Sequence, residues 1–78
     1  MIIELEFKLI VGTIHFKDIE TGYWVINDGE REYRIVNIPL ELKQKGTKTA
    51  VMAQILESED SIYITSLNLK IIEFKILT

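Results

Sequence analysis

The stretch IELEFKLIVGTIHFK, residues 3–17, decides the fold because its apolar residues alternate with charged and polar ones. From residue 3 to residue 9 the odd positions are apolar and the even positions are charged, which is the period of a half-buried β-strand. Beyond Gly12 the apolar positions are Ile14 and Phe16, so the alternation changes phase. A phase change requires an extra residue or a sharp bend, and a glycine accommodates either. We therefore predict one long strand, bent near Gly12, such as a small barrel needs to turn a corner.

The rest of the chain contains four further strand patterns, at residues 23–26, 31–38, 47–56 and 62–76. Asn27-Asp28-Gly29 predicts a hairpin between the first two of them. Loops of two, three or four residues all fit this hairpin, and a slip of one residue exchanges the two faces of a strand. The sequence therefore does not decide whether Trp24 faces the core or the solvent.

The last two strand patterns indicate which positions face the core. In the stretch 47–56 one phase is shared by Thr49, Val51, Ala53 and Ile55. In the final stretch the apolar positions change phase at Ile71-Ile72, so we predict a second long, bent strand.

Between the third and fourth strands, residues 40–45 lose the period of two and consist of good helix formers. Pro39 fits a first helical position and Gly46 fits the stop after a helix. We predict one or two turns of helix here.

This order of elements predicts an all-β fold, a five-stranded antiparallel OB-like β-barrel with one short helix between strands 3 and 4. Hydrophobic residues make up 47% of the 78 residues. That proportion supports one core, so we predict a single domain over residues 1–78. The alternative is another small barrel, such as an SH3-like one, which rarely carries a helix at this place.

The composition weighs against several classes of function. The chain has no cysteine, which excludes disulfides, zinc ribbons and thiol catalysis. A small domain without disulfides fits the cytoplasm, and a removed signal or lipoprotein peptide is the alternative. No stretch approaches the roughly 18 apolar residues of a membrane span. The formal net charge of -3 weighs against a nucleic-acid partner, because basic surfaces bind such partners.

Short motifs built from glycines, a turn and a helix cap carry a family resemblance. They are Gly12-Thr13-Ile14, Glu20-Thr21-Gly22-Tyr23-Trp24, Tyr33, Asn37-Ile38-Pro39-Leu40-Glu41-Leu42, Gly46 and Val51. In these motifs, spread over roughly residues 12–74, the chain resembles small single-domain OB-fold-like proteins of unknown function from bacteria and archaea, some of them lipoproteins. The resemblance implies the fold and no activity. Ala53 departs from the family pattern, in which a glycine is expected.

Aromatic residues mark a candidate ligand-binding face. Tyr23, Trp24 and Tyr33 fall on the second and third strands, the face on which OB domains stack bases or sugars. Arg34 adds a cation to this face. The alternative is that the aromatic rings fill the core while the arginines pair with neighbouring glutamates.

Two acidic loops flank this face in the predicted topology. Asp18 and Glu20 lie between the first and second strands, and Glu59 lies with Glu57 and Asp60 between the fourth and fifth. Their carboxylates would repel a phosphate backbone and would suit a cationic partner or, weakly, a divalent ion. We add Asp18, Glu20 and Glu59 to the candidate ligand-binding residues. The alternative is that these acidic turns only serve solubility.

No catalytic, metal-binding or cofactor-binding motif is recognisable. His15 is the only histidine, and a metal site needs several converging ligands, so we predict a surface histidine. No serine lies in the glycine-flanked setting of a hydrolase nucleophile. We predict that the protein is not an enzyme and takes no cofactor.

These observations favour a non-enzymatic binding or interaction module that uses the face of the second and third strands for a protein or a small polar ligand. The first alternative is a single-stranded nucleic-acid-binding OB domain, with charge from Arg31, Arg34 and Lys48. The second is a structural homodimerisation domain, in which the long first and last strands pair across two copies. No membrane partner is predicted.

Overall fold

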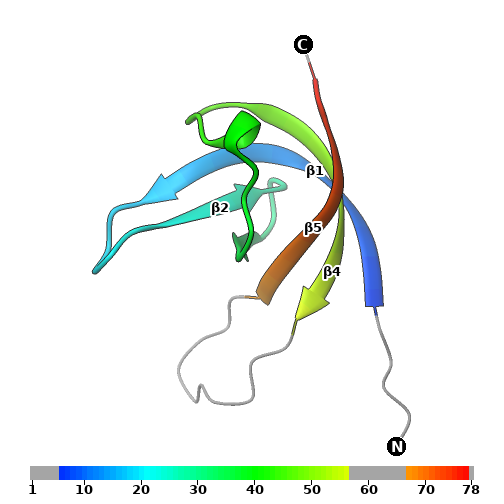
Figure 1. Ribbon diagram of the computed structural model, residues 1–78, viewed down its shortest axis with the longest axis horizontal. Coiled ribbons are helices and arrows are strands. Elements are labelled where there is room, and N and C mark those ends of the chain that lie inside the picture. Colours follow the sequence, from blue (N-terminus) through cyan, green and yellow to red (C-terminus); the bar gives the residue numbers. More distant parts are fainter. Residues whose placement is uncertain (1–5, 57–66, 78) are drawn as a thin grey trace, which may run out of the picture.

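Five β-strands and one short 3₁₀ turn make up the structure, a computed structural model that describes residues 6–56 and 67–77 (Figure 1). The elements are β1 (Glu6–Lys17), β2 (Tyr23–Asn27), β3 (Glu32–Ile35), η1 (Leu40–Leu42), β4 (Lys48–Leu56) and β5 (Leu67–Ile76). The all-β class and the five strands confirm the prediction. The parts of the first and last strands predicted over residues 3–5 and 62–66 lie outside the described residues.

The five strands close into a ring. In the order β1-β2-β3-β5-β4 each strand pairs with the next, and β4 pairs with β1. All pairs are antiparallel except β3 with β5, which is parallel. The β3–β5 pair is thus the one departure from the predicted antiparallel arrangement. The reason is topological: strands in a ring of five cannot alternate direction throughout, so one neighbouring pair must run the same way.

Strand β1 keeps one phase along its described length. Ile10 and Ile14 are buried, whereas Phe7, Leu9 and Val11 are 54%, 61% and 53% exposed. The predicted change of phase at Gly12 was therefore wrong. The apolar residues at the odd positions lie on the outer face of the ring.

Gly12 nevertheless lies at the corner of β1, the point where the strand passes from pairing with β4 to pairing with β2. The pairing of β1 with β4 extends to Thr13, and the pairing with β2 begins at that same residue. A Cβ at Gly12 would overlap the carbonyl oxygen of Asn27 and lie 2.8 Å from its carbonyl carbon. The glycine is therefore required because β1 and β2 approach closely, and not because the strand contains an extra residue.

The phase predicted for β4 and the position of the phase change in β5 are confirmed, but Ile72, Phe74 and Ile76 beyond that change are exposed and do not join the core. The positions predicted to face the core from β4 are buried or packed against it: Thr49, Val51, Ala53 and Ile55. The register between β4 and β5 shifts, because Met52 pairs with Glu73 while Ala53 pairs with Ile71. Ile72 is therefore the extra residue of a β-bulge, at the predicted change of phase.

A four-residue loop joins β2 to β3, because Asn27 pairs with Glu32. The Asp28 carboxylate accepts hydrogen bonds from the backbone N–H groups of Arg31 at 2.8 Å and Glu30 at 2.9 Å. These bonds lower the pKa of Asp28 below its ordinary value because they stabilise the charged carboxylate. The bond from Arg31 has the larger effect on this pKa and the bond from Glu30 the smaller one.

This hydrogen bonding predicts a pH-dependent effect of Asp28→Asn. Because the folded pKa of Asp28 is lowered, its stabilisation is present above the unfolded pKa of about 3.9 and is lost as the pH falls through the folded pKa. We expect the variant to be less stable than the wild type at neutral pH and equally stable in strong acid. Urea denaturation at both pH values measures this difference.

Asp18→Asn is the control for the Asp28 experiment, because Asp18 is an exposed carboxylate on another loop. A loss of stability shared by both variants would be an effect of removing one negative charge. A deficit of Asp28→Asn that stays constant from neutral pH into acid would contradict the role assigned to the charged carboxylate.

The connection between β3 and β4 contains less helix than predicted. Of the predicted residues 40–45, only Leu40–Leu42 form a 3₁₀ turn. Leu42 is the only buried residue of this turn. A longer helix would bury little more apolar surface, and short helices without such burial are marginal. Pro39 precedes the turn, and Gly46 follows it with a φ of 85°.

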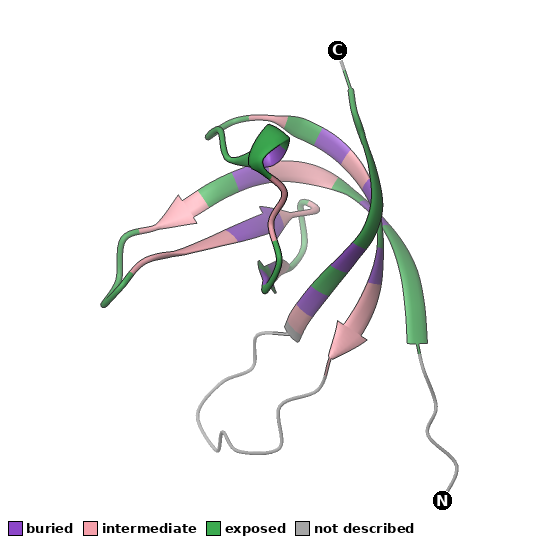
Figure 2. Ribbon diagram, in the orientation of Figure 1, coloured by how far each residue is buried: buried purple, intermediate pink, exposed green. Residues whose placement is uncertain are grey.

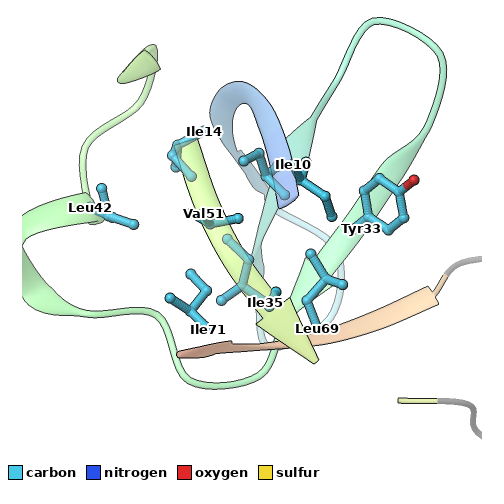
Figure 3. Close-up of a cluster of buried hydrophobic side chains, with 10 residues drawn as sticks. Ile10, Ile14, Tyr33, Ile35, Leu42, Val51, Leu69 and Ile71 are labelled. Atoms are coloured by element: carbon cyan, nitrogen blue, oxygen red, sulfur yellow. The ribbon is translucent and has the colours of Figure 1, made fainter. Parts of the chain in front are cut away.

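A cluster of buried apolar side chains fills the ring (Figure 3), and Figure 2 marks the buried residues along the strands. All five strands and η1 contribute to it, through Ile10, Ile14, Ile26, Tyr33, Ile35, Leu42, Val51, Ala53, Leu69 and Ile71. In Figure 3 these side chains point toward a common centre, and the Tyr33 ring lies at one end of the cluster. The inner face of the sheet is therefore occupied by the core. A ligand has access to outer faces, strand edges and the grooves between strands.

Candidate binding groove

An open groove of about 360 Å³ lies where the start of β2, the end of β3 and the start of β5 meet. Its lining residues are Gly22, Tyr23, Trp24, Arg34, Ile35, Val36 and Asn68. The structure therefore brings together three of the predicted ligand-binding residues, Tyr23, Trp24 and Arg34. The β1–β2 loop enters the groove at Gly22, and β5 enters it at Asn68.

Tyr23 and Arg34 form one side of the groove. Arg34 is exposed, and the centre of its guanidinium lies 4.7 Å from the centre of the Tyr23 ring. A guanidinium at this distance is attracted by the electrons of the aromatic face. The stacking restricts the Arg34 side chain and covers one face of the Tyr23 ring.

The outer face of the sheet beside Tyr23 and Arg34 offers no further binding surface, because its side chains are buried or paired. Val25 pairs with Arg34 across β2 and β3, and it is only 2% exposed. Lys17 on β1 forms an ion pair with Glu32 on β3, with 2.9 Å between Nζ and Oε2. This ion pair crosses over β2, which lies between the two strands. Both partners are more than a third exposed, so the ion pair contributes at most about 1 kcal/mol to stability. Its consequence for binding is that the charge of Lys17 is already compensated.

Trp24 forms the inner side of the groove, which answers the question of register that the sequence leaves open. Trp24 pairs with Phe16 of β1, and their ring centres lie 5.0 Å apart. The indole is half-buried and packs against the core. Gly22 has a φ of 83°, and the Phe16 ring occupies the place where its Cβ would lie. These contacts fix the indole, so that only part of it reaches the groove.

Tyr33 belongs to the core and not to the groove. It is fully buried, and its hydroxyl donates a hydrogen bond to Asp28 Oδ2 at 3.5 Å and accepts one from Lys8 Nζ at 3.3 Å. Lys8 Nζ also lies 5.7 Å from the centre of the ring. The ring therefore offers no exposed face on which a ligand could stack.

Two of the acidic candidates, Asp18 and Glu20, do not line the groove. Asp18 and Glu20 are exposed on the β1–β2 loop, where Glu20 has a left-handed φ of 57°. Glu59 lies outside the described residues. Lys48, a predicted source of positive charge, lines a different hollow, formed by residues 44–48 and the end of β5.

The sequence interpretation missed three contributors to this surface: Phe16, Asn68 and the Lys17–Glu32 ion pair. Their roles depend on strand register, because Phe16 meets Trp24 as its cross-strand partner. Asn68 reaches the groove because β5 pairs in parallel with β3, where it lies opposite Arg34. The length of the β1–β2 loop, which sets the pairing of Lys17 with Tyr23 and so of Phe16 with Trp24, is the signal that would have located Phe16.

The groove presents groups suited to recognition: a guanidinium, an amide and aromatic carbon. Within residues 6–56 and 67–77, no three His, Cys, Asp or Glu side chains are grouped so as to hold a metal ion. His15 is exposed on β1, which confirms the surface position predicted for it. Over the same ranges, no helix has the length and apolarity needed to cross a membrane.

No family model, curated protein or solved structure matches the chain. The resemblance to small OB-fold-like proteins therefore stays a prediction from sequence motifs. Since a fold alone does not specify an activity, the function is inferred from the residues of the groove.

Proposed function

We propose that the protein is an OB-like, non-enzymatic binding module that holds a protein segment or a small polar ligand in the groove between β2, β3 and β5. The observation that supports this most strongly is the meeting of Tyr23, Trp24 and Arg34 in one groove of about 360 Å³. Ligand sites combine apolar and aromatic surface with a few placed polar groups, at volumes from roughly 300 Å³ upward. In OB folds the face of the second and third strands binds the ligand.

Arg34 defines the chemistry that the ligand must supply. Its guanidinium already lies over Tyr23, so less side-chain freedom is lost when a ligand binds. A guanidinium donates two parallel hydrogen bonds to a carboxylate, or single bonds to carbonyl oxygens. Asn68 adds an amide donor and acceptor to the same groove. A short peptide that carries a carboxylate beside an apolar side chain matches these groups.

A single-stranded nucleic acid has less support. Binding such a chain requires several cations along a groove, together with exposed rings for stacking. Here Lys17 is paired with Glu32, and Tyr33 is buried. Arg34 is then the one cation among the residues that line the described groove. One guanidinium suits one carboxylate better than a row of phosphates.

Trp24 is the natural probe of binding, because it is the only tryptophan and lines the groove. We would titrate the protein with a library of short acidic and neutral peptides and, separately, with a thymidine oligonucleotide. Tryptophan fluorescence and ¹H–¹⁵N chemical shifts report the outcome. Peptides should perturb the amides of Tyr23, Trp24 and Arg34. No perturbation by any peptide would contradict the proposal, and salt-sensitive quenching by the oligonucleotide would favour the nucleic-acid alternative.

Arg34→Ala is expected to weaken binding of an acidic peptide about tenfold, because it removes a charge-assisted hydrogen bond. Arg31→Ala is the matched control, since Arg31 is an exposed arginine of the same hairpin that does not line the groove. Isothermal titration of both variants with the same peptide gives the comparison. Equal losses in the two variants would indicate a non-specific effect of charge and would contradict a specific role for Arg34.

A further inference from the structure

The C-terminal half of β5 has an open edge in the part of the chain that the structure describes. On one side, β5 pairs with β4 along its length. On the other side, β3 pairs only with residues 67–69, and Asn37 then bonds the backbone N–H and C=O of Ile71 at 2.7 and 3.0 Å. No described element pairs with this side of residues 72–76. Figure 2 shows this half of the strand as exposed up to its C-terminal end.

Backbone hydrogen-bonding groups point toward the open side. Successive residues of an antiparallel strand direct their N–H and C=O groups alternately to the two neighbouring strands. Leu77 donates to the carbonyl oxygen of Lys48 on β4 at 2.8 Å. By alternation, the groups of Ile76 and Phe74 face away from β4. Such an edge is a template for a further strand.

Exposed apolar side chains occupy every second position along this edge. Ile72 is 51% exposed, Phe74 36% and Ile76 42%. The intervening Glu73 and Lys75 are also exposed. Large apolar side chains placed this regularly on an open strand edge are typical of a surface that another chain covers.

Residues 72–76 read Ile-Glu-Phe-Lys-Ile, which is complementary to itself when two copies run antiparallel. With Phe74 opposite the second Phe74, Glu73 lies opposite Lys75 on both sides of the centre. In the same register Ile72 lies opposite Ile76. Aromatic pairs, apolar pairs and opposite charges directly across two strands are all stabilising.

Other registers are less favourable for the same residues. A shift by two positions places Glu73 opposite Glu73, or Lys75 opposite Lys75, and like charges in direct opposition repel. A shift by one position places charged side chains opposite apolar ones. Parallel pairing in register aligns each charge with its own copy. The strand therefore specifies one two-fold symmetric arrangement and disfavours the others.

We propose that two copies of this chain associate through β5, by antiparallel pairing of residues 72–76 centred on Phe74. The outward backbone groups of the two Phe74 residues form the central pair of hydrogen bonds. The five-stranded sheets of the two copies thereby join into one continuous sheet. The candidate groove meets β5 at Asn68, at the other end of the strand. The dimer therefore leaves both grooves accessible.

Charge reversal tests this register directly, because Glu73 and Lys75 are exposed and not needed for the core. Sedimentation equilibrium of the wild-type chain should show a dimer. Glu73→Lys or Lys75→Glu alone turns two attractive pairs into two repulsive ones, and each should weaken the dimer about tenfold or more. The double variant Glu73→Lys/Lys75→Glu should regain wild-type association. An equimolar mixture of the two single variants should form a heterodimer, since every Glu then faces a Lys.

A cysteine supplies a second measurement, because the natural chain contains none. Phe74→Cys places two thiols across the two-fold axis, with Cα atoms about 5.5 Å apart, which is within reach of a disulfide. It should form a disulfide-linked dimer on oxidation, whereas Leu9→Cys on the outer face of β1 should not. A chain that stays monomeric at about 1 mM would overturn the proposal. A dimer that tolerates both single charge reversals but is lost in Leu9→Glu would overturn it too, because the outer face of β1 would then be the interface.

Discussion

Replacing Gly12 with alanine is expected to lower the free energy of unfolding by about 3 kcal/mol or more. The added Cβ would overlap the carbonyl oxygen of Asn27 and lie 3.1 Å from Ile26 Cγ1. The carbonyl belongs to the backbone of β2 and cannot rotate away as a side chain would, so the two strands must separate at the corner. A chain of this length has a total stability of roughly 4 to 12 kcal/mol. The midpoint of thermal unfolding should therefore fall by roughly 12 to 24 °C.

Gly29→Ala is the matched control for the Gly12 experiment. Gly29 has a φ of 98°, so alanine is strained there, but its Cβ would meet no other atom within 4 Å. This variant should lose only the roughly 1 to 2 kcal/mol of a left-handed conformation. Urea denaturation of both variants separates backbone strain from the steric overlap. If Gly12→Ala loses no more stability than Gly29→Ala, β1 and β2 are not packed as closely at the corner as the structure shows.

The strands that could be predicted in detail are those with one strongly apolar phase. On β4 the inner face is the phase of Thr49, Val51 and Ala53, all fully buried, whereas the other phase includes Lys48 and Gln54. On β5 the two adjacent isoleucines at 71 and 72 break the alternation and so reveal the bulge, in which Ile71 is buried and Ile72 is the extra residue. On β4 and on β5 up to Ile71 the pattern of burial follows the pattern of hydrophobicity, whereas Phe74 and Ile76 beyond the bulge are exposed.

The inner face of the first half of β1 could not be predicted, because over residues 6–11 the more apolar of the two faces is the outer one. Phe7 and Leu9 are exposed, whereas Lys8 lies on the inner side beside Tyr33. A lysine can occupy such a position because its aliphatic stem packs against the ring while its ammonium group reaches a polar partner at the rim. Here that partner is the Tyr33 hydroxyl at 3.3 Å. Alternation gives the period of a strand but does not identify which phase is buried.

The candidate site was predictable only in part, because the predicted Tyr33, Asp18 and Glu20 do not line the groove. Tyr23, Trp24 and Arg34 do meet, and they do so because of the hairpin register. Asn27-Asp28-Gly29 marks the turn, yet the four-residue loop depends on the Asp28 carboxylate bonding two backbone N–H groups. Once that register is fixed, Tyr33 faces inward while Arg34 faces outward. A loop shorter by one residue would have exchanged them.

Tyr33→Ala is expected to lower the free energy of unfolding by about 3 to 5 kcal/mol, which is most of the stability of a domain of this size. Tyr33 is the largest of the fully buried side chains, and its ring packs in the cluster that fills the sheet (Figure 3). Its removal leaves a cavity between β2, β3 and β5 that a ring of paired strands cannot collapse to fill. Urea denaturation followed by circular dichroism measures the loss.

Tyr33→Phe separates the contribution of the aromatic ring to stability from that of the hydroxyl. The hydroxyl interacts with Lys8 at 3.3 Å and with Asp28 at 3.5 Å, and both partners can turn to water at the rim, so the variant should lose about 1 kcal/mol or less. The two variants also distinguish a core residue from a stacking residue. If Tyr33 is part of the core, the phenylalanine variant keeps both stability and peptide binding, and the alanine variant loses the fold. If the alanine variant stayed folded and lost only peptide binding, Tyr33 would be a ligand contact, as the sequence first predicted, and its burial in the structure would be wrong.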